Sequence, residues 1–261
     1  MRSEYQLYPS LLDAYQDYLD AESRWEKFYG GSDDPSVSCD DYVEKSRREL
    51  IDKINRVPFE SDAADCGTAF NILVDLVSGN GEKEDDFSFV EESDAYTTTY
   101  KGKVFTFCKN LVNRFASFFS FSACQYKCVG QIETKYGAVT LYGYIDELLC
   151  YEIHDIKTTS KYEVFKFRNH WQHIVYPYCI RYEGYDVSLF QYDVVLWGKG
   201  LDDYKIYKEV YDYREERDSN KLREHCEGLI EFIQFHRDEI TDKKIFNCLD
   251  GQDEMIEKYG E

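Results

Sequence analysis

The stretch "GYIDELLCYEIHDIKTTSKYEVFKFRNHWQHIVYPY", residues 143–178, places two aspartates and a lysine in a strand-like pattern that leads into a helix-like one. Its first part alternates apolar and polar residues, which predicts antiparallel strands around Asp146 and Asp155. Asp155 and Lys157 then point to one face, because side chains along a strand alternate with a period of two. If the two strands pair, both carboxylates share one end of the sheet.

These charged residues suggest a metal site, although a simpler interpretation exists. An Asp-x-Lys triplet on an exposed strand is usually a solvated ion pair of little energetic worth. The residues around Asp155 and Lys157 are apolar, however, and buried charges are seldom kept without a partner or a metal. Two close carboxylates repel each other unless a cation lies between them, and Mg²⁺ or Mn²⁺ prefers such oxygen ligands. We therefore predict a divalent metal ion bound by Asp146, Asp155 and the carbonyl of Ile156, with Lys157 beside the metal-bound water.

The helix expected over residues 163–183 brings two more polar side chains toward this end of the sheet. Gln172 and Tyr176 are four residues apart, so they lie one turn apart on the flank of the apolar stripe. Taken alone, they are a hydrogen-bonded pair on a helix flank. Next to the carboxylates, they would brace the metal site. Pro177 must kink this helix or leave a carbonyl without its donor.

The rest of the chain predicts an α+β fold with a mixed central sheet flanked by helices. Helices are expected over residues 5–29, 38–57 and 61–79, and an acidic loop over 82–95. Strand patterns follow over 130–159, 186–198 and 204–213, and an amphipathic helix over 216–240. We expect one domain, 1–261, with a mainly helical part (1–100), a catalytic core (101–200) and a C-terminal strand and helix (201–261).

The charge of the chain argues against nucleic-acid binding, but it is unevenly distributed. The 51 acidic and 31 basic residues give a net charge of −20, which repels a polyanion. Residues 101–128 nevertheless contain no acid and carry Lys101, Lys103, Lys109 and Arg114 among phenylalanines. The phenylalanines could stack on unpaired bases, but their helical spacing is mainly a burial signal. With Thr158 and Lys161 near the proposed site, these four cations are the predicted nucleic-acid contacts.

Two further expectations come from composition. The chain has no apolar run long enough to span a bilayer, and its first residues lack a signal-peptide pattern, so a cytoplasmic protein is expected. The nine cysteines form no CxxC pair and are interpreted as reduced, buried thiols. Cys179, Cys226 and Cys248 are too widely spaced for an iron–sulfur cluster, and none is expected.

The motifs together resemble the PD-(D/E)XK nuclease superfamily, and most closely its RecB-like and lambda-exonuclease-like branch. The likeness rests on "GYID" ending at Asp146, "DIK" over 155–157 and "QHIVY" over 172–176. It extends weakly to "YPSLLDAYQDYL" at 8–19 and to "CGTAFNILVDL" at 66–76. In the latter, Asn71 stands where the branch often has a metal-binding His, and Asp75 where it often has Glu.

The resemblance implies a restriction-endonuclease-like fold and a magnesium-dependent active site. It makes Asp146 and Asp155 metal ligands, Lys157 the catalytic lysine, and Gln172 and Tyr176 braces of the site and the DNA strand. The upstream ligands would be Asn71 and Asp75; Asn offers an oxygen to Mg²⁺ but is a poorer ligand for softer metals.

The function expected from this resemblance is a DNA exonuclease of recombination, repair or phage type. Its implied partner is linear duplex or single-stranded DNA, with a single-strand annealing protein and a second copy of the chain as further partners. Two alternatives stay open: a catalytically weak binding or interaction module on a nuclease fold, and a phosphodiesterase acting on RNA or nucleotides.

Overall fold

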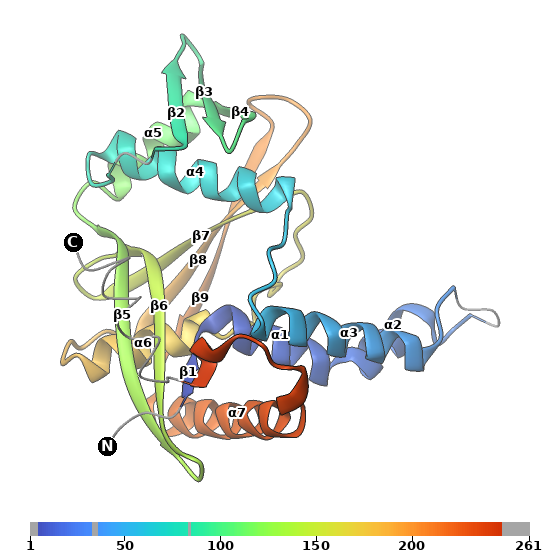
Figure 1. The fold of residues 1–261 in the computed structure, drawn as a ribbon. Helices are drawn as coiled ribbons and strands as arrows, with labels where there is room; N and C mark the ends of the chain where they lie inside the picture. Colours follow the sequence, from blue (N-terminus) through green and yellow to red (C-terminus); the bar gives the residue numbers. More distant parts are fainter. Residues whose placement is uncertain (1–4, 33–35, 83–84, 247–261) are drawn as a thin grey trace.

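The computed structural model describes residues 5–32, 36–82 and 85–246 and shows an α+β protein (Figure 1). Helices fill the N-terminal part and strands the middle of the chain. In chain order the elements are β1 (Tyr5–Leu7), α1 (Pro9–Leu19), α2 (Ala21–Tyr29), α3 (Cys39–Ile54), α4 (Asp62–Ser78), β2 (Phe87–Glu91), β3 (Ala95–Tyr100), β4 (Lys103–Cys108), α5 (Lys109–Phe118), β5 (Ala123–Thr134), β6 (Gly137–Leu148), β7 (Glu152–Thr159), α6 (Gln172–Tyr182), β8 (Leu189–Trp197), β9 (Tyr204–Asp212), α7 (Glu215–Phe235), η1 (Arg237–Glu239) and η2 (Lys243–Phe246). The predicted α+β class is confirmed.

The main sheet has six strands and is built around β6. The order is β1-β6-β7-β8-β9, and β5 pairs with the other edge of β6 along its whole length. Strands β1 and β6 are parallel, as are β7 and β8, whereas β6–β7 and β8–β9 are antiparallel. Strands β2, β3 and β4 form a separate antiparallel sheet. The main sheet is therefore mixed, as the sequence predicted.

One edge of β6 is interrupted where the fold places the candidate site. This edge pairs with β1 at Val139–Leu141 and with β7 only at Glu147 and Leu148. Among the described strands, none continues that edge between the two paired segments, over residues 142–146. A side chain in this interval can therefore lie between strands that have separated, and Asp146 is one of these residues.

Helices α1, α6 and α7 lie on one side of the main sheet and α4 and α5 on the other (Figure 1), and each side has its own hydrophobic cluster. The first contains buried side chains of α1, α3, α6 and α7, such as Leu12 and Ile174. The second contains side chains of α4, α5 and the small sheet, such as Phe70 and Phe107, with Ile156 contributed by β7. Since side chains alternate along a strand, Asp155 faces the first cluster while Ile156 faces the second.

Helix α4 has clear terminal signals and lies close to β7. The side chain of Ser61 accepts a hydrogen bond from the backbone N–H of Ala64 and caps the first turn. The helix ends at Gly79, which adopts a left-handed conformation with φ of 84°. A Cβ at Gly67 would lie 3.0 Å from Oγ1 of Thr158, so glycine permits the close approach of helix and strand.

Three predicted elements are wrong in part. The start of the 5–29 helix is strand β1, whose three residues pair with β6, and the remainder is two helices. The acidic loop over 82–95 includes strand β2, which is held by β3. The helix expected over 163–183 begins only at Gln172, because Phe165 has a φ of 63° that no α-helix contains. Pro177 lies within that shorter helix.

The described part of the chain has no helix that combines the length and apolarity needed to cross a membrane. Its eight cysteines are free thiols, four of them buried. Cys179 and Cys226 belong to the first hydrophobic cluster, as buried thiols do. Cys248 lies outside the described residues.

Candidate functional site

Asp146 occupies the interval where β6 and β7 separate. Its Oδ2 accepts hydrogen bonds from the backbone N–H of Ile156 at 3.0 Å and from Nδ2 of Asn71 at 3.1 Å. The first bond takes the place of a strand-to-strand bond, and the second links the sheet to α4. The sequence pattern led us to expect that β6 and β7 pair as far as Asp146 and Asp155. Instead they pair at only two positions, Glu147 with His154 and Leu148 with Ile153.

Asp155, Lys157 and Gln172 form the other half of the site. Nζ of Lys157 lies 2.7 Å from Oδ2 of Asp155, and Nε2 of Gln172 donates to Oδ1 of the same carboxylate at 2.5 Å. Gln172 also lies 3.4 Å from the hydroxyl of Tyr176, one turn further along α6. Asp155 is only 1% exposed, whereas the side chain of Lys157 is 26% exposed. The structure thus brings these four predicted residues together, with the lysine at the open side.

The charge of Asp155 is close enough to Asp146 to influence the protonation of Asp146. Burial, and then the charge of Asp155, raises the pKa of Asp146 to about 8, although Lys157 and the Ile156 N–H act in the opposite direction. Burial alone would lower the pKa of Lys157, but the charges of Asp155 and Asp146 outweigh it and raise that pKa. At neutral pH Lys157 is therefore a cation, whereas Asp146 largely keeps its proton in the metal-free protein.

Helix α1 fixes the start of α6, which sequence reasoning missed. Oδ1 of Asp13 accepts a hydrogen bond from the backbone N–H of Trp171 at 2.7 Å, immediately before Gln172. The other carboxylate oxygen of Asp13 lies 3.2 Å from Nδ1 of His170. A side chain from a distant helix thus satisfies a free N–H at the helix N-terminus. No local cap pattern signals it, because Asp13 is 158 residues away.

The packing of α6 on β6 explains the glycine of the "GYID" motif. A Cβ at Gly143 would lie 2.5 Å from Cε1 of Tyr176 and 3.4 Å from Cδ of Pro9. Any side chain at this position would displace Tyr176 or the helix that carries it. Gly143 therefore sets the distance between the sheet and the side chains that support Asp155.

Asp75 lies one turn beyond Asn71 but has a different immediate partner. It shares a hydrogen bond with Glu147, whose carboxylate also accepts a hydrogen bond from Ser122. Burial raises the pKa of Glu147 to about 9; the bond from Ser122 opposes this rise, and the charge of Asp75 adds to it. A cavity of about 440 Å³ borders Asp75. In the sequence, the only sign of the pair of Asp75 and Glu147 is Glu147 itself, the second acid of "IDEL".

The donor groups around Asp146 fit a hard divalent cation. Oδ1 of Asn71 is buried and has no hydrogen-bond partner, although its amide nitrogen bonds Asp146. Two carboxylates, an amide oxygen and the main chain of Ile156 are the oxygen donors that Mg²⁺ or Mn²⁺ takes in proteins. No group of three or more His, Cys, Asp or Glu side chains among the described residues is arranged to hold a metal. The fit therefore depends on the two aspartates together with neutral oxygens.

Three of the predicted nucleic-acid contacts are held in ion pairs. Lys101 lies 3.3 Å from Asp65, and Lys103 lies 2.6 Å from the same residue and 2.7 Å from Asp62. Lys109 lies 2.7 Å from Glu91. Acidic residues of α4 and β2 thus neutralise these three lysines. Residues 101–128 contain no acid, so these ion pairs could not be predicted from that segment alone.

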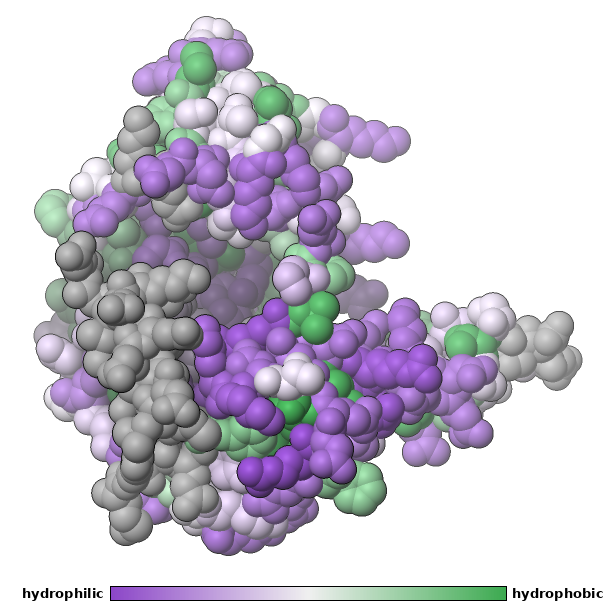
Figure 2. All heavy atoms as spheres, viewed as in Figure 1, coloured by the Kyte–Doolittle hydropathy of each residue, from purple (hydrophilic) through white to green (hydrophobic). Residues whose placement is uncertain are grey.

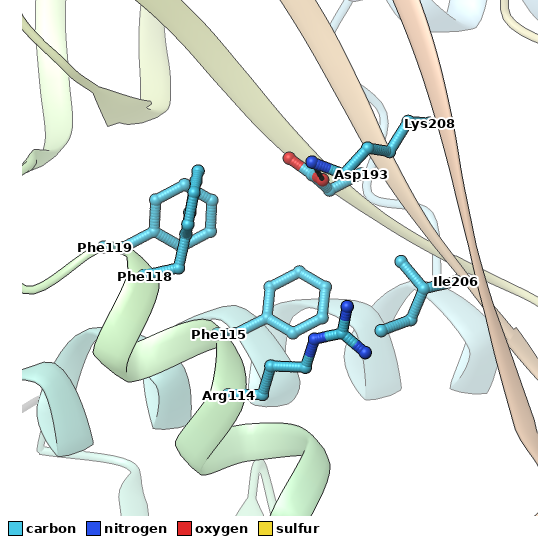
Figure 3. A pocket seen from close by; sticks show the side chains of 7 residues that line it. All are labelled: Arg114, Phe115, Phe118, Phe119, Asp193, Ile206 and Lys208. Atoms are coloured by element: carbon cyan, nitrogen blue, oxygen red, sulfur yellow. Dashed lines mark ion pairs between the residues drawn. The ribbon is translucent and has the colours of Figure 1, made fainter.

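Arg114 lies on the face of the sheet opposite Asp155 and Lys157. Figure 3 shows it at a cavity of about 180 Å³, with Phe115, Phe118 and Phe119 from α5 and Asp193 and Lys208 from β8 and β9. Phe115 and Phe119 are core residues, as the helical spacing indicated, whereas Phe118 is half exposed. Because Asp193 pairs with Ile156, this cavity belongs to the α4 and α5 side.

The remaining predicted contacts lie beyond Lys157 on β7 and in the segment that follows. Thr158 is partly buried against Gly67 of α4. Lys161 is exposed, and its backbone carbonyl accepts a hydrogen bond from Nζ of Lys166 at 2.9 Å. Figure 2 shows that the molecular face is hollowed between the part that carries α4 and the part that carries α1 and α3.

Comparisons with known proteins do not indicate a function for this site. No protein family matches the chain, and no curated protein does. A crystal structure named SSO0001 is similar over 88% of this chain and 78% of its own, with 11% sequence identity and a TM-score of 0.45. Nothing about the reaction follows from a similarity of this strength.

Proposed function

We propose that this protein is a divalent-metal-dependent nuclease that hydrolyses phosphodiester bonds in DNA. The observation that supports it is the cluster of Asp146, Asp155, Lys157 and Gln172, in which a partly buried and a buried carboxyl group lie beside a single cation. A carboxyl group whose pKa is raised this far by burial and a like charge favours a functional role. A divalent cation would allow both aspartates to ionise, and the oxygen donors suit Mg²⁺ or Mn²⁺.

Each side chain has a distinct part in this proposal. Asp146 and Asp155 would hold the metal ion, with the free Oδ1 of Asn71 and the Ile156 carbonyl as further donors. A bound divalent ion would activate water and neutralise charge on a phosphoryl oxygen. Lys157, being protonated, would orient the nucleophilic water and stabilise the developing negative charge rather than accept a proton first. Gln172 holds Asp155 in place and is itself held through α6.

The preference for DNA and for cleavage from an end comes from the resemblance to the RecB-like and lambda-exonuclease-like nucleases. On the same basis we propose a role in recombination, repair or phage replication. A single-strand annealing protein and a second copy of the chain are the partners that this resemblance suggests. A phosphodiesterase acting on RNA would use the same residues.

A second candidate function is a binding or interaction module with little catalysis. The net charge of −20 and the ion pairs of Lys101, Lys103 and Lys109 favour it, because they leave less positive surface for a long duplex. The intact arrangement of Asp155 and Lys157 favours the enzyme.

The deciding experiment is degradation of end-labelled DNA. Linear duplex, single-stranded DNA and RNA would be incubated with Mg²⁺, Mn²⁺ or EDTA, using the wild type, Lys157→Ala and Lys205→Ala. Lys205 is an exposed lysine of β9 and serves as the matched control. Metal-dependent cleavage that is lost only in Lys157→Ala supports the nuclease, and the order of label release gives its polarity. Folded protein that cleaves none of these substrates would leave the binding module as the better account.

A further inference from the structure

A second cavity, outside the cluster described above, has an unusual concentration of positive charge for so acidic a protein. It has a volume of about 330 Å³ and lies between the start of α6, the edge strand β9 and the first turns of α7. Its charged lining is Arg168, Arg214, Arg217 and Lys221 against only Asp212 and Asp218. The cavity thus has two cations in excess, while the whole chain has a net charge of −20.

The two acids are already occupied by two of these cations. Asp212 lies 3.0 Å from Nε of Arg214, and Asp218 lies 2.7 Å from Nε of Arg217. Asp218 also accepts a hydrogen bond from the backbone N–H of Arg214 at 2.7 Å. These carboxylates therefore have little capacity for further cations.

The other two cations have no acid partner among the described residues. Arg168 makes no ion pair there, and Lys221 lies over the Trp171 ring, 4.9 Å from its centroid. Burial lowers the pKa of Lys221; the charge of Asp218 is the main opposing effect, and the charges of Arg217 and Arg168 add smaller lowering effects. The cations are thus close enough to repel one another, and an anion would relieve that repulsion.

One residue that lines the same cavity has a buried polar atom without a partner. His173 lines it and is 8% exposed, and its Nδ1 makes no hydrogen bond. Burial, and then the charge of Lys221, lowers the pKa of His173 to about 3, so the ring is neutral and can donate one N–H. Residues of the first turns of α6 and α7 line this cavity, and the partial positive charge of a helix N-terminus favours an anion.

The cavity lies on the same face of the sheet as the proposed active site. His173 directly follows Gln172, which bonds Asp155. Its ring packs against Tyr192 and stacks on Tyr211, with centroids 6.2 and 4.2 Å away. Tyr192 is the β8 partner of Asp155, and β9 is two strand spacings from β7, about 10 Å. Packed aromatic side chains therefore link this cavity to the strand beside Asp155.

We infer that Arg168, Lys221 and His173 form a phosphate-binding subsite that holds a backbone phosphate of the nucleic-acid strand being cleaved. The inference rests on the proposed function for the identity of the strand, whereas the phosphate chemistry follows from the cavity itself. Guanidinium and ammonium groups form charge-assisted hydrogen bonds with phosphate oxygens, and the histidine N–H supplies a third donor.

The test measures binding without cleavage. A short fluorescent single-stranded oligonucleotide would be titrated in EDTA with the wild type, with Arg168→Ala/Lys221→Ala and with Lys199→Ala/Lys205→Ala. The last variant removes the same charge from exposed lysines elsewhere. We expect about tenfold weaker binding for the first double variant only, and a salt dependence whose slope falls by about 0.7, because one phosphate contact on a single strand is lost. Inorganic phosphate should compete with the oligonucleotide on the wild type.

Two results would overturn the inference. One is equal oligonucleotide affinity and salt dependence for the wild type and the Arg168/Lys221 variant. The other is loss of inorganic phosphate binding with unchanged oligonucleotide binding, because the phosphate would then belong to a small molecule. The variant Arg168→Lys/Lys221→Arg keeps both charges and should bind nearly as the wild type does, which excludes a folding defect as the cause. Because metal is absent, failure of cleavage leaves this result unaffected.

Discussion

Replacing Asp146 by Asn should stabilise the metal-free protein and abolish its stabilisation by Mg²⁺. Burial and the neighbouring Asp155 raise the pKa of Asp146 from 3.8 to about 8, so the folded state resists its ionisation. Between these two pH values the unfolded chain releases a proton that the folded protein keeps. The wild type therefore loses stability as pH rises from about 4 to about 8. Asparagine removes this penalty and keeps an oxygen for the N–H of Ile156.

The size of the gain can be bounded from that pKa. One pKa unit is worth about 1.4 kcal/mol, which gives about 5 kcal/mol at pH 8 as an upper limit. Water entry and the movement of Lys157 screen buried charges, so we expect a gain of about 1–3 kcal/mol in the free energy of unfolding. For the wild type, a metal concentration of 100 times Kd should add about 2.7 kcal/mol. The Asp146→Asn variant has lost one of the two charged ligands and should show little of this stabilisation by metal.

Urea unfolding of both proteins at pH 5 and pH 8, with Mg²⁺ or with EDTA, measures these quantities. Asp238→Asn is the matched control, because Asp238 is exposed and lies outside the site. The variant should gain more at pH 8 than at pH 5 in EDTA, and the order of stabilities should reverse in Mg²⁺. A variant less stable than the wild type in EDTA at pH 8 would refute the reasoning, because Asp146 would then be a stabilising ion-pair partner.

Three further predictions test other parts of the structure. Lys157→Ala should lower metal-dependent cleavage by about 10²–10⁴-fold, and equal rates would contradict the catalytic role. In EDTA it should also lower the thermal unfolding midpoint, because buried Asp155 loses its cation. Gly143→Ala should destabilise the fold by about 1–3 kcal/mol in urea unfolding, because its Cβ would meet Tyr176; an unchanged midpoint would contradict the close packing. Burial lowers the pKa of His225 from 6.5 to about 4, so the unfolded state gains a proton first on acidification, and the free energy of unfolding should fall by about 2 kcal/mol between pH 7 and pH 5. His225→Gln should flatten that dependence, and a slope equal to that of the wild type would exclude His225 as its source.

The sequence predicted those elements whose signals are local. Alternation over 130–159 indicated β5, β6 and β7, and Ser61 and Gly79 mark the two ends of α4. Strand β1 could not be recognised, because three residues carry too little pattern and its partner β6 begins 130 residues later. Short strands of this kind are stabilised by tertiary pairing rather than by their own propensity.

The residues of the candidate site that follow a local pattern could also be predicted from the sequence. The contacts that were missed join residues far apart in the sequence. Asp155, Lys157 and Gln172 follow one another along one strand and one helix, so the local pattern brings them to one face. The contacts of Asn71 with Asp146 and of Asp13 with Trp171 join residues far apart in the sequence. These contacts form because α4 packs against the sheet and α1 packs against the start of α6. The spacing of residues in the sequence does not predict this packing.

A net charge of −20 is compatible with a nucleic-acid substrate if some cations are not neutralised by acids of the protein and remain available to phosphates. The basic stretch at 101–128 contributes less than its composition suggests, since Lys101, Lys103 and Lys109 neutralise acids of the protein itself. In the described part of the chain, Arg168 and Lys221 have no such partner, and they line a cavity together with His173, which directly follows Gln172. At physiological ionic strength, charges beyond about 8 Å are largely screened, so distant acids weaken this local attraction little. Such an arrangement favours a few phosphate contacts beside the scissile bond over a long electrostatic footprint. It therefore suits a strand end or a short single-stranded segment better than an extended duplex.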